Sequence, residues 1–152
     1  MACLDPSLRP PGCQPVNLRC LNKRFPDNST ARNWFEEQRW GVNLQHIECP
    51  RCHSNKINFV LNHNPAPYRC RGCRSFFSVK VGTIMQSSHL DYRTWAIALS
   101  LWWSSSKKLS SMQMHRDLGV TQKSAWFLLN KLKLSCSLCG SLFSSTIQCE
   151  PY

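Results

Sequence analysis

The chain has 152 residues and a formal net charge of +11, because it contains 19 Lys and Arg residues but 8 Asp and Glu residues. This length excludes a long enzyme and accommodates one ordinary domain or two small ones. The positive charge favours a polyanion as partner, although a solvated basic surface or a ribosome-type RNA contact would have the same charge.

The N-terminus has no secretory signal pattern, and no stretch has the roughly 20 apolar residues that span a bilayer. We therefore expect an intracellular chain with reduced thiols, in the cytoplasm at the nucleoid, or in the nucleus of a eukaryotic cell. The sequence contains ten cysteines. In such a compartment, paired cysteines are expected to bind metal rather than to form disulfides.

The first segment, 1–24, is rich in proline and shows no sustained hydrophobic periodicity, so we expect most of it to be disordered. Its cysteines have irregular spacing, which makes a second metal site there a weak hypothesis. They are Cys3, Cys13 and Cys20.

A helix is expected next, with caps offered by Asp27, Asn28 and Ser29 and an end near Arg39. Its aromatic residues suit either stacking on bases or core packing against the following segment, and packing is the favoured role. These residues are Trp34, Phe35 and, just after the helix, Trp40.

Two Cys-x-x-Cys pairs follow, Cys49 with Cys52 and Cys70 with Cys73, separated by seventeen residues. A separation of about 15 to 20 residues is typical of a four-thiolate zinc site, in which each pair presents two sulfurs to one tetrahedral ion. The spacing predicts one zinc ion held by all four cysteines. Two disulfides, or four unrelated buried thiols, are the alternatives.

The residues between and after the pairs predict a zinc ribbon. Segments 56–61 and 74–81 are rich in β-branched and aromatic residues and are expected to form antiparallel strands, with a turn at 62–67. His46, His53 or His63 could replace a cysteine ligand, but each is interpreted as an ordinary surface or packing histidine.

The chain after the ribbon predicts three helices. The first carries an apolar stripe of Tyr92, Trp95, Leu99 and Trp102, and a polar, basic connector at 104–108 follows it. The second runs from a serine cap at 110 or 111 to Leu118, and Gly119 ends it.

The third predicted helix begins after Thr121 and runs to about Leu132, which completes a helix-turn-helix. It buries Ala125, Leu128, Leu129 and Leu132 and exposes Gln122, Lys123 and Ser124 in its first turn. Those first-turn positions meet base edges when such a helix enters a major groove. A plain three-helix packing module has the same apolar pattern, but the basic charge and the ribbon favour DNA.

The ordered motifs resemble a known family. They are Phe25-Pro26-Asp27, Arg39-Trp40, the first cysteine pair, the run from Tyr68 to Val79, Gly82-Thr83-Ile84 and the run from Ser110 to Trp126. Together they resemble the transposase zinc-ribbon domain, the N-terminal DNA-binding half of bacterial insertion-sequence transposases related to the Merlin superfamily. The resemblance covers about Phe25 to Lys133. It implies that a zinc ribbon and a helix-turn-helix hold the terminal inverted repeats of a transposon.

In that family an RNase H-like domain follows and cuts DNA with acidic residues and divalent metal. Here the only acidic residue after Asp117 is Glu150, and two-metal strand transfer needs several carboxylates. We therefore expect no enzymatic activity and no catalytic residues.

Two features depart from the family pattern. His53 stands where such ribbons have Gly, at a position that favours positive φ. The tail 135–152, with Cys136, Cys139 and Cys149, resembles nothing in the family, and a frameshift or an early stop is our hypothesis for its origin.

The expected fold is small α+β: an N-terminal helix, a four-cysteine antiparallel zinc ribbon and a three-helix helix-turn-helix region, with disordered ends. The expected segments are 1–24 (disordered), 25–86 (helix plus ribbon), 87–134 (helix-turn-helix) and 135–152 (unrelated tail). The expected function is binding of transposon ends without catalysis. A stand-alone regulatory or interaction protein, or a subunit of a separate catalytic chain, is the alternative.

The expected partners are double-stranded DNA and a full-length transposase, with neither a membrane nor a small-molecule substrate. Gln122, Lys123 and Ser124 are expected to meet base edges. Basic residues on the ribbon and around the helices are expected to contact phosphates. These are Arg69, Arg71, Arg74, Lys107, Lys108, Lys131 and Lys133.

Overall fold

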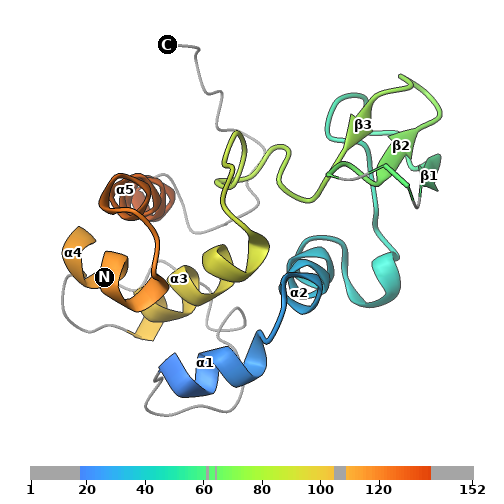
Figure 1. Ribbon diagram of the computed structural model, residues 1–152. Coiled ribbons are helices and arrows are strands. Elements are labelled where there is room, and N and C mark those ends of the chain that lie inside the picture. The colour runs from blue at the N-terminus through green and yellow to red at the C-terminus, as the bar shows by residue number, and fades with distance from the viewer. Residues whose placement is uncertain (1–17, 61, 64, 105–108, 138–152) are drawn as a thin grey trace. The chain divides into compact units, whose positions relative to one another are not determined.

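The computed structural model describes residues 18–60, 62–63, 65–104 and 109–137 (Figure 1). The described part contains five α-helices, one 3-10 helix and a three-stranded antiparallel sheet, which confirms the small α+β class. None of the helices in these ranges combines the length and the hydropathy needed to cross a membrane. The chain divides into two compact units, one with residues 18–33, 89–104 and 109–137 and one with residues 34–88, apart from 61 and 64.

The first unit is a helical cluster built around α3 (Tyr92–Ser104), which contacts α1 (Leu18–Arg24), α4 (Ser111–Leu118) and α5 (Gln122–Ser137). Apolar side chains from all four helices are fully or almost fully buried, and burial of this kind is the main source of stability in a small domain. They include Leu21, Trp95, Leu99, Met114, Ala125, Leu128 and Leu132.

The helix-turn-helix forms as the sequence predicts. Ser110 caps α4 by accepting a hydrogen bond from the backbone N–H of Gln113 at 3.1 Å. Gly119 ends the helix in the left-handed region with φ 65°, and Thr121 caps α5 by accepting from the backbone N–H of Ser124 at 3.2 Å. The turn therefore uses three local signals that are visible in the sequence.

Helix α1 corrects the prediction for segment 1–24. Residues from Leu18 onward, which the sequence left without structure, form a helix whose Leu21 is buried and which packs against α3. A helix of seven residues shows too few turns for periodicity to be recognised, and tertiary packing stabilises it. The rest of that segment lies outside the described residues.

The other end of the unit also differs from the prediction. Helix α5 continues past Leu132 to Ser137, so the first three residues of the predicted tail are helical. Ser135 is buried and donates its hydroxyl to the carbonyl of Leu132 at 2.8 Å, which satisfies this polar group inside the helix. Residues 138–152 lie outside the described part of the chain.

The start of α2 (Asn28–Trp40) is bonded to the start of α3 through the side chain of Asn28. Asp27 caps α2, because its Oδ1 accepts from the backbone N–H of Thr30 at 2.7 Å. Asn28, predicted as a cap for its own helix, instead accepts from the backbone N–H of Tyr92 at 2.8 Å and so caps α3. This contact joins residues 64 positions apart, and the beginning of α2, up to Asn33, belongs to the helical unit.

The second unit contains the ribbon, whose strands are β1 (Ile57–Phe59), β2 (Tyr68–Cys70) and β3 (Phe76–Phe77) in the order β1-β2-β3. The two predicted strands correspond to β1 and β3, and β2 was missed. Its three residues follow Pro67 and end at the first cysteine of the second pair, too short a run for an alternating pattern.

Of the second predicted strand, 74–81, only Phe76 and Phe77 are in a strand. Arg74 has a φ of 59°, which a strand does not allow. Further on, the carbonyls of Val79 and Val81 accept hydrogen bonds from Arg39 Nη1 at 2.8 and 2.7 Å. These carbonyls therefore bond to a side chain of α2 rather than to another strand.

Aromatic packing joins the end of α2 to the sheet. The ring of Trp40 is buried and meets Tyr68 of β2 edge to face at 5.1 Å and Phe77 of β3 at 6.2 Å. Phe35 is also buried, while Trp34 is half-buried against Phe35. The prediction that these side chains pack in the core is confirmed for Phe35 and Trp40.

Candidate metal centre

The two cysteine pairs have the same local backbone geometry. In the first, the N–H of Cys49 donates to the carbonyl of Ser54 at 3.1 Å, and in the second the N–H of Cys70 donates to the carbonyl of Ser75 at 3.0 Å. The residue after each pair lies in the left-handed region, with φ 55° at His53 and 59° at Arg74. Each pair therefore forms a tight knuckle of the same conformation, and the predicted positive φ at His53 is confirmed.

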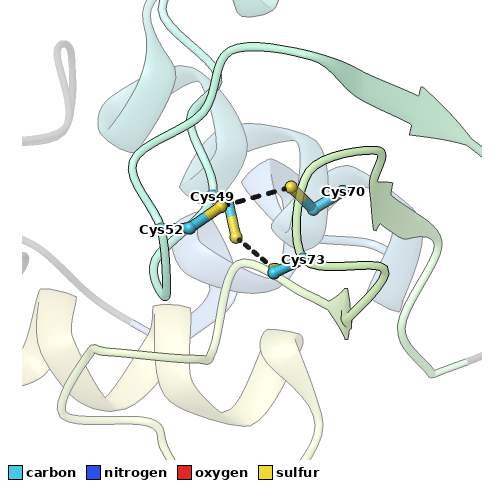
Figure 2. Close-up of side chains that lie close together, drawn as sticks. All are labelled: Cys49, Cys52, Cys70 and Cys73. Carbon is cyan, nitrogen blue, oxygen red and sulfur yellow. Dashed lines mark hydrogen bonds between the residues drawn. The ribbon is translucent and has the colours of Figure 1, made fainter.

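The four sulfurs converge between the knuckles (Figure 2). All four lie within 4.8 Å of one another, and the distances between the knuckles are 3.6 Å for Cys49 to Cys73 and 3.5 Å for Cys52 to Cys70. A tetrahedral ion with metal–sulfur bonds of about 2.3 Å places its sulfurs about 3.8 Å apart. The cluster therefore fits one metal ion bound by four cysteines.

The alternatives raised by the sequence do not fit these sulfurs. A disulfide needs a sulfur–sulfur distance of about 2.05 Å, and the four cysteines are free. Four unrelated thiols would not share one centre. Within the described residues, no other group of three or more His, Cys, Asp or Glu side chains has its ligand atoms gathered in this way.

Hydrogen bonds around the sulfurs favour thiolates. The hydroxyl of Ser75, at 2.8 Å, and its backbone N–H lower the pKa of Cys73 to about 6. The backbone N–H of Cys73 lowers the pKa of Cys70. Donors aimed at sulfur stabilise the charged form that binds a metal.

The pKa of Cys52 reflects its close contacts with the other three sulfurs. The backbone N–H of Ser54 lowers its pKa, but the thiol contacts with Cys70, Cys73 and Cys49, together with burial, outweigh this and raise the pKa to about 11. Negative charge on one sulfur opposes ionisation of the next. A cation at the centre removes this opposition, so metal binding and loss of the thiol protons are coupled.

The three candidate histidines stand apart from this cluster of ligand atoms. His63 donates its Nδ1–H to the carbonyl of Ala66 at 2.8 Å, and its ring stacks on Phe76. His46 and His53 are exposed. The interpretation of these residues as packing or surface histidines is consistent with these positions.

The remaining cysteines give one correction. Cys20 on α1 is disulfide-bonded, so the expectation that the thiols are all reduced is wrong for this residue. Cys3, Cys13, Cys139 and Cys149 lie outside the described residues, and Cys136 lies in the last turns of α5. The hypothesis of a second metal site near the N-terminus stays a hypothesis.

The predicted DNA contacts divide between the two units. In the first, Gln122 and Lys123 are exposed, whereas Ser124 is half-buried and its hydroxyl bonds to that of Thr121 at 2.9 Å. Lys133 is exposed and Lys131 half-buried. In the second, the ribbon arginines Arg69, Arg71 and Arg74 are all exposed. Lys107 and Lys108 lie outside the described residues.

Of the three exposed aromatic side chains in the described residues, Phe59, Phe76 and Trp126, none had a predicted site role. Trp126 on α5 is 60% exposed, and Phe76 on β3 is 41% exposed. The signal for Trp126 was its place four residues after Gln122, outside the buried stripe of α5. The signal for Phe76 was its alternation with the buried Phe77, which puts the two rings on opposite faces of the sheet.

Comparisons with family models, with curated proteins and with solved structures found no match to this chain.

Proposed function

We propose that this protein binds duplex DNA without cutting it, through a zinc-stabilised ribbon and a helix-turn-helix of the transposase type, and that its targets are the terminal inverted repeats of a transposon. The resemblance in the ordered motifs suggests the target. The chemistry of the two units supports each part of the proposal separately.

Zinc is the ion that suits the four cysteines best. Thiolate is a soft ligand, and a closed set of four thiolates in tetrahedral arrangement is the usual structural zinc site, with no position open for a substrate. The ion therefore has a structural role, in which it joins the two knuckles of a sheet that is otherwise too small to be stable.

The observation that carries the DNA-binding proposal is the start of α5. Its first turn exposes Gln122 and Lys123, while the opposite side of the helix is buried against the rest of the unit. The helix carries three lysines and no acidic residue. A helix with this arrangement can enter a major groove, where Gln pairs with adenine and Lys with guanine.

Basic residues outside the first turn supply phosphate contacts. Lys131 and Lys133 lie further along α5, and Lys107 and Lys108 precede α4 in the sequence. Contacts of this kind hold the duplex without reading its sequence and make the affinity depend on salt. Arg74 on the ribbon is assigned the same role.

The proposal includes no catalytic activity, because the sequence has too few acidic residues after Asp117. Strand transfer needs several carboxylates converging on two metal ions. Beyond Asp117 the sequence contains only Glu150. Purified protein should therefore leave bound DNA intact in Mg²⁺ or Mn²⁺.

The proposal is tested by selection from a pool of random-sequence duplexes with the zinc-loaded protein. Rounds of binding should enrich one sequence family, and its affinity should fall linearly with the logarithm of salt concentration. Binding that enriches no sequence, or that is insensitive to salt, would contradict a helix-turn-helix that reads base edges.

A further inference from the structure

One face of the ribbon sheet combines positive charge with an exposed aromatic ring. Asn58 pairs with Arg69, and Arg69 pairs with Phe76, so these residues form one row across the three strands. All three are exposed, whereas Cys70 and Phe77, which follow Arg69 and Phe76 in sequence, are buried. Because successive side chains of a strand point to opposite faces, the row lies on the solvent side of the sheet.

The same face continues beyond the row. The backbone N–H of Arg71 donates to the carbonyl of Lys56 at 2.9 Å, which extends the pairing of β1 with β2 by one position. Arg71 also donates its Nε–H to Asn58 Oδ1 at 2.8 Å, so its side chain lies along this face. Lys56 and Arg71 are both exposed.

The ribbon has a surplus of positive charge. From Cys49 to Leu90 the sequence contains six Lys and Arg residues and no Asp or Glu. Four thiolates with one divalent ion carry a net charge of about −2, which offsets only part of this surplus. The ribbon therefore complements a polyanion.

The aromatic ring lies within a preformed cluster of flat groups. The ring of His63 stacks on Phe76 with centroids 3.9 Å apart and an interplanar angle of 12°. The guanidinium of Arg69 lies over the Phe76 ring at 5.4 Å. The hydrogen bond from His63 to Ala66 fixes the imidazole. Unpaired bases stack on such aromatic and guanidinium planes, in a manner that tolerates any sequence.

We infer that this face is a binding surface for a single-stranded polynucleotide, with a base stacked on the cluster of His63, Phe76 and Arg69 and with phosphates paired to Lys56 and Arg71. A duplex does not offer the same contact, because its bases are already stacked on one another. The surface belongs to the ribbon unit and does not depend on the duplex contacts proposed for α5.

The test uses the full-length, zinc-loaded protein and fluorescein-labelled oligo-dT and oligo-U of about 15 nucleotides, within the usual range of site sizes for single-strand binding. Phe76→Ala and Arg69→Ala should each weaken binding roughly 5- to 150-fold, as expected for loss of one stacked base. Arg69→Lys should also weaken it, because lysine keeps the charge but has no plane. Sensitivity to Phe76→Ala with either oligonucleotide supports the surface.

Phe59→Ala is the matched control. Phe59 is 52% exposed, but it pairs with the buried Tyr68 and so lies on the other face of the same sheet. Its loss should change the affinity for oligo-dT less than about twofold. Equal losses for Phe59→Ala and Phe76→Ala, or no binding of either oligonucleotide by zinc-loaded protein, would overturn the inference. If Phe76→Ala loses its zinc, the affinity of Arg69→Lys for the oligonucleotides tests the surface instead, because Arg69 is exposed and its replacement should not disturb the fold.

Two variants distinguish single-strand binding by the ribbon from duplex binding by α5. Lys123→Ala should impair duplex binding and leave oligo-dT binding unchanged, whereas Phe76→Ala should do the reverse. Parallel loss of both activities in both variants would contradict two distinct surfaces.

Discussion

Ser54 and Ser75 occupy equivalent positions in the two knuckles but make different contacts. The hydroxyl of Ser75 donates to Cys73 Sγ at 2.8 Å, whereas the hydroxyl of Ser54 accepts from the backbone N–H of Lys56 at 3.3 Å. Only the second knuckle therefore uses a side chain to stabilise a thiolate. The effect is visible in the pKa of Cys73, which is lowered to about 6.

We predict that Ser75→Ala raises the pH at which the metal is released. The thiol must lose its proton to bind metal, and the hydroxyl lowers the pKa of Cys73. Without the hydroxyl this pKa rises, so protons compete with the metal at a higher pH. Release can be followed with a zinc-sensitive dye during acid titration.

Ser54→Ala is the control for this titration, because the Ser54 hydroxyl bonds to a backbone N–H instead of a sulfur. Its release curve should coincide with that of the unaltered protein. A Ser75→Ala curve that also coincides, or that shifts to lower pH, would show that the Ser75 hydroxyl does not support the thiolate.

At the scale of elements, the turn between α4 and α5 depends on one glycine. Gly119 has a φ of 65°, and a Cβ placed there would meet no atom within 4 Å. Backbone conformation alone, and not space, therefore requires glycine at this position.

We predict that Gly119→Ala lowers the free energy of unfolding by about 1 to 2 kcal/mol, the cost of a left-handed conformation for a residue with a Cβ. Gly119→Asn should cost less, because asparagine tolerates this region. Denaturant unfolding of the two variants measures both effects. An alanine variant as stable as the unaltered protein would contradict the role given to this turn.

The elements that the sequence predicted correctly are those with strong local signals. The two Cys-x-x-Cys pairs, the serine cap at Ser110 and the break at Gly119 are each recognisable from short sequence motifs, so they can be read without the fold. Helix α1 and strand β2 were missed, because a helix of seven residues and a strand of three gain their stability from packing and pairing with distant segments.

Hydrogen bonds between side chains and groups far apart in the sequence could not be predicted either. The residues around Asn28 do not show whether its side chain caps its own helix or α3. Nor does the sequence show that Arg39 bonds to the carbonyls of Val79 and Val81, which shortens the predicted second strand. Both cases are long-range hydrogen bonds that override local preference.

At the scale of the whole molecule, the two units have different sources of stability. The first buries large apolar side chains from four helices, among them Trp95, Leu99 and Leu128. The second has a sheet with strands of two or three residues, too short to be stable alone, around four cysteines. Metal binding should therefore matter to the second unit far more than to the first.

We predict that chelation of the metal unfolds the ribbon and leaves α3, α4 and α5 folded. Hydrogen exchange should show fast exchange at the amides of β1, β2 and β3 and retained protection in the three helices. Cys70→Ser should reproduce the effect and lose the metal, which elemental analysis should find at one zinc per chain in the unaltered protein. Loss of protection in all helices on chelation would contradict independent stability.

The proposed reading of base edges by the first turn of α5 is tested most directly by the ratio of two affinities. The affinity for the selected duplex is divided by that for a scrambled duplex at one salt concentration. In Gln122→Ala and Lys123→Ala this ratio should fall roughly 5- to 150-fold, the equivalent of about 1 to 3 kcal/mol per lost base contact. Lys23→Ala, which removes an equal charge from the exposed side of α1, should leave the ratio unchanged. An unchanged ratio in both α5 variants would contradict the claim.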